Sequence, residues 1–161
     1  MNEWLKRGLM AALAMGILTA GTTDTAFAQS AGKVIKKRRA LMKSNGKSFK
    51  VIKAFLKSGK GSAADVQKAA MTLASNGGKI PGLYPKGTSS TDGVGKTRAK
   101  PAIWAKWADF EAAAGKLKAA GGNLAKVAAM GEAGAIKAAA GAIGKACGGC
   151  HKPFRGPKQK K

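Results

Sequence analysis

The chain has 161 residues, with 30 lysines and arginines against 7 acidic residues, so its net charge is +23 and its length predicts one domain. Hydrophobic residues make up 45% of it, too much for a disordered basic tail, while only 6% is aromatic, which argues against an all-β sandwich or barrel. Its one histidine excludes metal centres with several imidazoles, and its two cysteines exclude a disulfide-rich scaffold.

Residues 1–28 are predicted to be a signal peptide. Two basic residues precede a short apolar run, and small residues follow up to Ala26-Phe27-Ala28, the A-x-A pattern of a cleavage site. The alternative is a membrane anchor, but the apolar run is about ten residues long and a span needs roughly twenty. We therefore expect residues 29–161 to form the mature domain in an oxidising exported compartment, most simply the bacterial periplasm.

The first half of the mature chain predicts two amphipathic helices. In the first, about 32–58, apolar residues recur every seven positions, with lysines on the other faces. The second begins at Ser62, where Asp65 three residues on resembles a capping box. We expect it to end at Asn76-Gly77-Gly78. A polar stretch of 77–100 then predicts a long loop along the outside of the molecule.

Two more helices are predicted in the second half. The third begins at Pro101, is interrupted at Gly121-Gly122 and continues briefly to Met130. The fourth spans about 132–154, and its apolar stripe is continued by both cysteines. Four such helices with mostly short connections predict an all-α, antiparallel four-helix bundle.

The strongest chemical signal is the sequence Cys147-Gly148-Gly149-Cys150-His151. Cys-x-x-Cys-His is typical of covalent attachment of a c-type haem. Two thiols on one helical turn can add to the two vinyl groups of a porphyrin, and the following imidazole can bind the iron from the same side. We therefore expect one haem c, held by Cys147 and Cys150, with His151 as an iron ligand.

Three other interpretations of this motif are weaker. A zinc site needs a fourth ligand, and the chain has no second cysteine–histidine pair. A thioredoxin-type pair belongs at a helix N-terminus beside strands, whereas this motif ends a helix. The remaining alternative is a plain structural disulfide.

A second iron ligand would decide what the haem does. Met42 lies on the core stripe of the first helix, with Arg38 one turn earlier on the same face. Its thioether could bind the iron, and the arginine could pair with a haem propionate. The alternative is that Met42 only fills the core, the usual role of a methionine at helical spacing. Met71 and Met130 are expected to be packing residues.

The arrangement resembles the class II cytochromes c, the cytochrome c-prime family. The similarity rests on the C-terminal haem motif followed by Phe154-Arg155 and on the run Arg38–Gly46 in the first helix. It implies a four-helix bundle with covalent haem inside. One branch of the family has five-coordinate iron that binds nitric oxide or carbon monoxide, and the other is a low-spin electron carrier with a helix-1 methionine as sixth ligand.

The run Leu41–Gly46 is most similar to the low-spin branch. Our expectation is therefore a periplasmic single-electron carrier, with His151 and Met42 on the iron and Arg38 or Arg39 at a propionate. The alternative is a five-coordinate protein that binds nitric oxide or carbon monoxide. An enzyme such as a haem peroxidase is not expected, because no distal acid or base is evident.

The charge of +23 predicts the partners. We expect an acidic redox protein or the anionic surface of a membrane, because a positive field speeds encounters with negative partners. Nucleic acid is not expected, because the lysines are spread over every helix and aromatic residues do not alternate with them. The lysine-dense first helix favours a monomer over the homodimer common in the resembling family.

Overall fold

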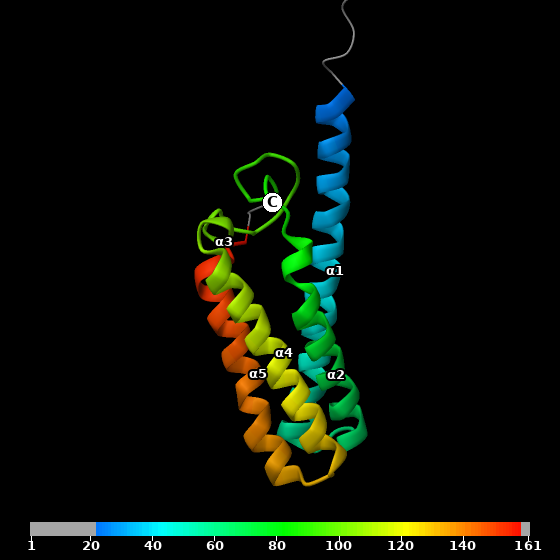
Figure 1. The fold of residues 1–161 in the computed structure, drawn as a ribbon. Helices are drawn as coiled ribbons and strands as arrows, with labels where there is room; N and C mark the ends of the chain where they lie inside the picture. Colours follow the sequence, from blue (N-terminus) through cyan, green and yellow to red (C-terminus); the bar gives the residue numbers. More distant parts are fainter. Residues whose placement is uncertain (1–21, 159–161) are drawn as a thin grey trace, which may run out of the picture.

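The computed structural model describes residues 22–158, which fold as an all-α bundle. Its elements are α1 (Thr22–Ser58), α2 (Ala63–Lys79), η1 (Pro81–Leu83), α3 (Ala102–Ala105), α4 (Trp107–Ala129) and α5 (Ala133–Phe154). The four long helices, α1, α2, α4 and α5, run up and down in turn (Figure 1). The predicted antiparallel four-helix bundle is therefore confirmed.

The helices pack as a chain of neighbours. The main backbone contacts within the described residues join α1 to α2, α2 to α4, and α4 to α5. No contact of similar extent joins α1 to α5 in that part of the chain. The apolar core lies between the helices, and its largest fully buried side chains include Ile52, Leu73, Phe110, Leu124 and Ile143. The first and last helices are thus held mainly through the middle pair.

The second helix begins as its sequence predicts. The Asp65 backbone N–H donates to Ser62 Oγ at 3.1 Å, and the Ser62 N–H donates to the Asp65 carboxylate at 2.9 Å, which completes a capping box. The hydrogen bonds from Ser62 lower the pKa of Asp65. This reciprocal pair satisfies two of the backbone donors that a helix start leaves free.

Two glycine pairs that were predicted to end or interrupt helices do neither. The second helix runs through Gly77 to Lys79, and α4 runs through Gly121 without a break. A Cβ built at Gly121 would lie 2.6 Å from the Ala74 nitrogen, and one at Gly77 would lie 2.6 Å from the Lys118 nitrogen. These glycines therefore serve the contact between α2 and α4, which brings the two backbones closer than any side chain permits.

Other helix boundaries also differ from the prediction. The predicted third helix is two helices, because Lys106, at φ −126° and ψ 53°, breaks it between α3 and α4. The first helix begins at Thr22 rather than near residue 32, so in the uncleaved chain it includes the last residues of the predicted leader. Residues 1–21, the rest of that leader, lie outside the described residues. No helix in the described chain is long and apolar enough to cross a membrane.

Two methionines expected to pack in the core are on the surface. Met71 is 57% exposed and Met130 is 69% exposed. Met71 lies on the outer face of α2, and Met130 follows the last residue of α4. Of the methionines weighed as iron ligands, only Met42 packs against the core.

The long loop after α2 covers one end of the bundle rather than running along its outside (Figure 1). Arg38 of α1 is 4% exposed, and its guanidinium makes five hydrogen bonds to this loop. Two go to the Leu83 carbonyl, two to the carbonyl and hydroxyl of Thr88, and one to the Thr97 hydroxyl. Burial lowers the pKa of Arg38, and the electrostatic interaction with Tyr84 opposes this effect by raising it. One buried cation thus fastens a loop that has little regular structure of its own.

The close approach of α2 and α4 predicts opposite effects for two adjacent substitutions. Gly121→Ala should lower the free energy of unfolding by about 1–3 kcal/mol, because the new methyl group meets the backbone of α2. Gly122→Ala is the matched control, since a Cβ there has nothing within 4 Å. It should raise stability by about 0.5–1 kcal/mol through helix propensity alone. Denaturant unfolding of both variants measures this, and equal effects would contradict the packing account.

The hydrogen bonds from Arg38 to the loop, here called the arginine clamp, predict that the loop loosens when this cation is removed. Arg38→Gln should lower stability by about 1–3 kcal/mol, because carbonyls that Arg38 satisfies lose their partner. Trypsin should then cut the loop at Lys86 and Lys96 faster than it does in the wild-type protein. Arg39→Gln, at the exposed neighbouring position, is the control and should leave the digestion pattern unchanged. A cleavage rate in Arg38→Gln equal to that of the wild type would refute the clamp.

Candidate functional site

The predicted haem-binding residues lie on the last two turns of α5. Cys147, Cys150 and His151 are half-buried, and both cysteines pack against the hydrophobic core. The buried residues Ile136, Ala140 and Ile143 precede them on the same helix, so the thiols continue the core-facing stripe as predicted. Two thiols and an imidazole are therefore presented together at the inner face of the bundle.

The electrostatic environment keeps these groups uncharged. Burial raises the pKa of the Cys147 thiol, and burial together with the charge of Cys147 raises the pKa of Cys150. Burial lowers the pKa of His151, and the positive charges of Arg155 and Arg98 lower it further. The imidazole is therefore neutral near pH 7 and has a lone pair free for a metal.

The first helix places Met42 at about the level of His151. A Cβ built at Gly144 would lie 3.9 Å from the ring of Phe49, so these residues meet across the bundle. Met42 lies two turns from Phe49 on α1, and His151 lies the same distance beyond Gly144 on the antiparallel α5. The structure therefore brings the two predicted iron ligands to one height in the bundle.

The sulfur of Met42 has a polar neighbour. Asn45 Nδ2 donates to Met42 Sδ at 4.0 Å, and Asn76 of α2 donates to the Asn45 side-chain oxygen at 2.7 Å. Asn76 also donates to the Ser44 hydroxyl at 3.3 Å. The Asn45 amide is therefore held in place by α2, and its nitrogen faces the thioether.

The residues present fit a covalently attached haem. The donor set is two half-buried neutral thiols one turn apart, followed at once by an imidazole, and this matches two vinyl additions and one axial bond. Both cysteines are free thiols in the structure. Across the described residues no cluster of three or more histidine, cysteine or acidic side chains is arranged to hold a metal ion, which leaves the zinc interpretation without support. The limited contact between α1 and α5 is compatible with a flat group between them.

The two arginines predicted to meet a propionate have different surroundings. All five guanidinium N–H groups of Arg38 are used by the loop, so a propionate could pair with it only by replacing one of those bonds. Arg39 is exposed on the next position of α1. The propionate contact of either arginine stays a prediction.

The sequence interpretation missed Tyr84, which lies in the covering loop next to this site. Its ring packs under Arg38, and it makes an edge contact with Phe110, whose centroid is 4.7 Å away. Phe110 in turn meets Phe154, one turn beyond Cys150, at 5.3 Å. The available signal was the only tyrosine of the chain, set between two prolines in a loop of unusual length.

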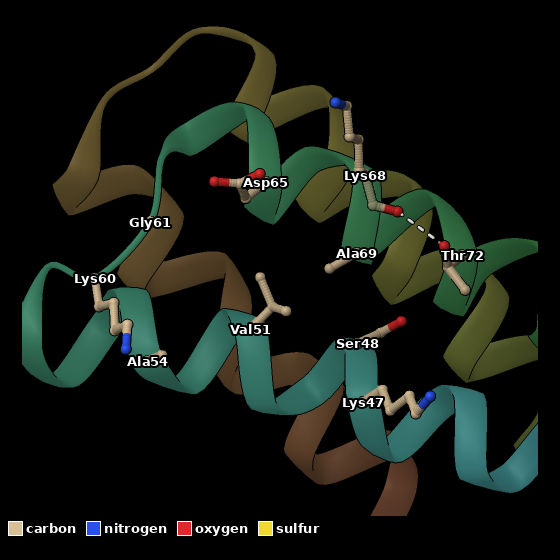
Figure 2. A pocket seen from close by; sticks show the side chains of 10 residues that line it. All are labelled: Lys47, Ser48, Val51, Ala54, Lys60, Gly61, Asp65, Lys68, Ala69 and Thr72. Carbon is tan, nitrogen blue, oxygen red and sulfur yellow. Dashed lines mark hydrogen bonds between the residues drawn. The ribbon is translucent and has the colours of Figure 1, made fainter.

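A surface groove between α1 and α2 has no comparable chemistry. Figure 2 shows its lining, which includes the lysines Lys47, Lys60 and Lys68 and the apolar side chain of Val51. The one carboxylate there, Asp65, is already bound by Ser62. The groove therefore adds positive charge to the surface rather than a second reactive site.

Comparison with known proteins agrees with this site. The family model described as Cytochrome C' matches residues 33–155. Cytochrome c' of Allochromatium vinosum is 36% identical, covering 91% of this chain and 97% of that protein. Cytochrome c-556 of Agrobacterium fabrum is 32% identical, covering 91% of this chain and 93% of that protein.

The fold is matched by a solved cytochrome c' that is described by an unusual ligand-controlled dimer dissociation. It has a TM-score of 0.72 and 35% identity, and the match covers 79% of this chain and 97% of that one. Members of this family are non-enzymatic haem proteins of the periplasm that bind one covalent haem c, and the Cys147–Cys150 pair is where that attachment falls in this chain. The chain therefore belongs to the cytochrome c' family.

Proposed function

We propose that this protein holds five-coordinate haem iron on His151 and binds a small gas, nitric oxide or carbon monoxide, on the opposite face. The bound haem would supply an iron with one coordination position for the gas. Cys147 and Cys150 fix the ring to α5, the neutral His151 supplies the protein ligand, and Met42 of α1 forms part of the wall on the other side. This differs from the electron-carrier function that the sequence favoured.

The contact between Asn45 and Met42 is the observation that carries this proposal. The Asn45 amide, oriented by Asn76, directs a donor at the thioether sulfur. The thioether sulfur therefore already accepts from an amide that α2 holds, which supports Met42 as a neighbour of the iron rather than as its ligand. The names of several relatives as cytochrome c', and the ligand control described for one solved relative, support the same view.

An electron carrier with Met42 as sixth ligand is the second candidate. It is favoured by the register of the helices, which sets Met42 at the height of His151. Some relatives are named cytochrome c-556 rather than cytochrome c'. In this alternative the Asn45 contact breaks when the haem is attached, and the sulfur turns toward α5.

The spin state of the ferric protein separates the two functions. We expect the wild-type holoprotein to be high-spin and its ferrous form to bind carbon monoxide readily. Met42→Leu keeps the volume of the side chain but removes the sulfur, and it should leave the spin state unchanged. Absorption and electron paramagnetic resonance spectra measure both. A low-spin wild type that becomes high-spin in Met42→Leu would establish the carrier instead.

We further propose that the chain is cleaved before Gln29, works in the periplasm and exchanges electrons with an acidic partner. Carbon monoxide binds ferrous but not ferric haem iron, so this part of the proposed function needs an electron donor. All eight lysines of α1 between residues 33 and 57 are exposed, and Lys47, Lys60 and Lys68 line the adjoining groove (Figure 2). A face of this charge attracts an acidic donor and opposes the approach of a second copy of the chain.

The proposed partner predicts a steep salt dependence. Reduction by an acidic donor protein should slow by roughly tenfold or more as salt rises from about 0.01 M to 1 M, because the screening length falls from about 30 Å to 3 Å. Stopped-flow mixing measures the rate. A basic donor of similar potential is the control and should show the opposite trend. A rate to the acidic donor that does not change with salt would exclude electrostatic steering.

A further inference from the structure

The ring of Tyr84 is held rigidly where the loop meets the bundle. The guanidinium carbon of Arg38 lies 3.9 Å from its centroid on one side, and Phe110 makes an edge contact with it. Trp104 Nε1 donates to the Tyr84 carbonyl at 3.0 Å, which fixes the backbone as well. The residue is only 8% exposed. Its hydroxyl is therefore set in one direction by contacts from α1, α3 and α4.

That hydroxyl has no hydrogen-bond partner among residues 22–158. Tyr84 takes part in hydrogen bonds only through its backbone. Every fully enclosed side-chain nitrogen or oxygen in the described chain has a partner, so the Tyr84 oxygen must border open space. A hydroxyl without a protein partner is unusual in a residue as buried as this one, which makes this position notable.

The Tyr84 ring lies on the side of the bundle that carries the haem-attachment turn. It contacts Phe110 at 4.7 Å between ring centroids, and Phe110 meets Phe154, one turn beyond Cys150 on α5, at 5.3 Å. Burial raises the pKa of Tyr84 to about 12. The hydroxyl keeps its proton over the physiological range and can act as a neutral donor.

Only a few groups of a haem can accept a hydrogen bond from this hydroxyl. The macrocycle, its methyl groups and its iron present an apolar or metallic surface, and a thioether sulfur is a weak acceptor. The two propionate carboxylates are the strong acceptors at its edge, and a hydrogen bond to a charged group is the stronger kind. The positive charge of Arg38 behind the Tyr84 ring also favours a carboxylate at this point.

We propose that the Tyr84 hydroxyl donates a hydrogen bond to a propionate of the haem attached at Cys147 and Cys150. Tyr84 is then a positioning residue that fixes one edge of the ring, while the thioethers fix the other. Arg38 supports this contact in two ways. It stacks on the Tyr84 ring, and its hydrogen bonds hold the loop that carries the tyrosine. The inference depends on the covalent haem and not on whether Met42 binds the iron.

The test compares two variants of the holoprotein. Tyr84→Phe keeps the ring and removes only the hydroxyl. Thr88→Val is the matched control, because it removes a hydroxyl that binds Arg38 and the Pro85 carbonyl but leaves the tyrosine hydroxyl in the chain. The resonance Raman band of propionate bending should shift in Tyr84→Phe and stay constant in Thr88→Val. A band that is the same in wild type and Tyr84→Phe, or that shifts equally in both variants, overturns the proposal.

A second measurement uses the wild-type protein alone, in case Tyr84→Phe fails to retain haem. Because Tyr84 is the only tyrosine, labelling with 13Cζ-tyrosine gives one NMR line. That line should move between the ferric and ferrous states if the hydroxyl lies at the haem edge. A line with the same shift in both states would contradict the contact. The absorption spectrum reads the spin state separately, so failure here is distinct from failure of the gas-binding proposal.

Discussion

The backbone contact between α2 and α4 is the constraint on which the rest of the structure depends. Gly77 and Gly121 let these helices approach until a single added methyl group would collide with the opposite main chain. The middle pair therefore forms the rigid centre of the bundle. The outer helices, α1 and α5, each pack on one member of that pair and have little backbone contact with one another. This arrangement allows a flat, covalently held group between α1 and α5 without disturbing the centre.

The loop after α2 covers one end of the bundle and is bound to α1. Arg38 draws the loop onto α1, and the Tyr84 ring then packs between Arg38 and Phe110. A β-bridge between Ala99 and Arg155 joins the end of the loop to the end of α5. The haem-attachment turn is thus enclosed by segments far apart in sequence. Rigidity of this kind favours a fixed haem position.

The sequence was informative wherever the signal is local. Apolar periodicity predicted the four long helices, and Ser62 with Asp65 predicted the start of α2. The haem motif was equally readable, because Cys147, Cys150 and His151 are adjacent on one helix. Errors arose where partners are distant. Glycine pairs resembled helix ends until their close contacts with another helix were visible.

The same reason explains what was missed in the candidate site. The partners of Arg38 lie in a loop that sequence patterns describe only as polar, so a propionate was the more obvious acceptor. Tyr84 gains its environment from α1, α3 and α4, and no spacing rule connects these segments. The Asn45–Asn76 pair joins two helices and changes how Met42 is interpreted. Such contacts depend on the tertiary fold, which periodicity alone does not determine.

The central claim is that α5 carries one haem bound covalently through Cys147 and Cys150. The most direct test is the intact mass of the protein purified from the periplasm of a strain able to attach haem c. The account predicts the mass of a polypeptide beginning at Gln29 plus one haem, unchanged after extraction with acid and acetone. A mass equal to the polypeptide alone, or haem lost on extraction, would contradict it.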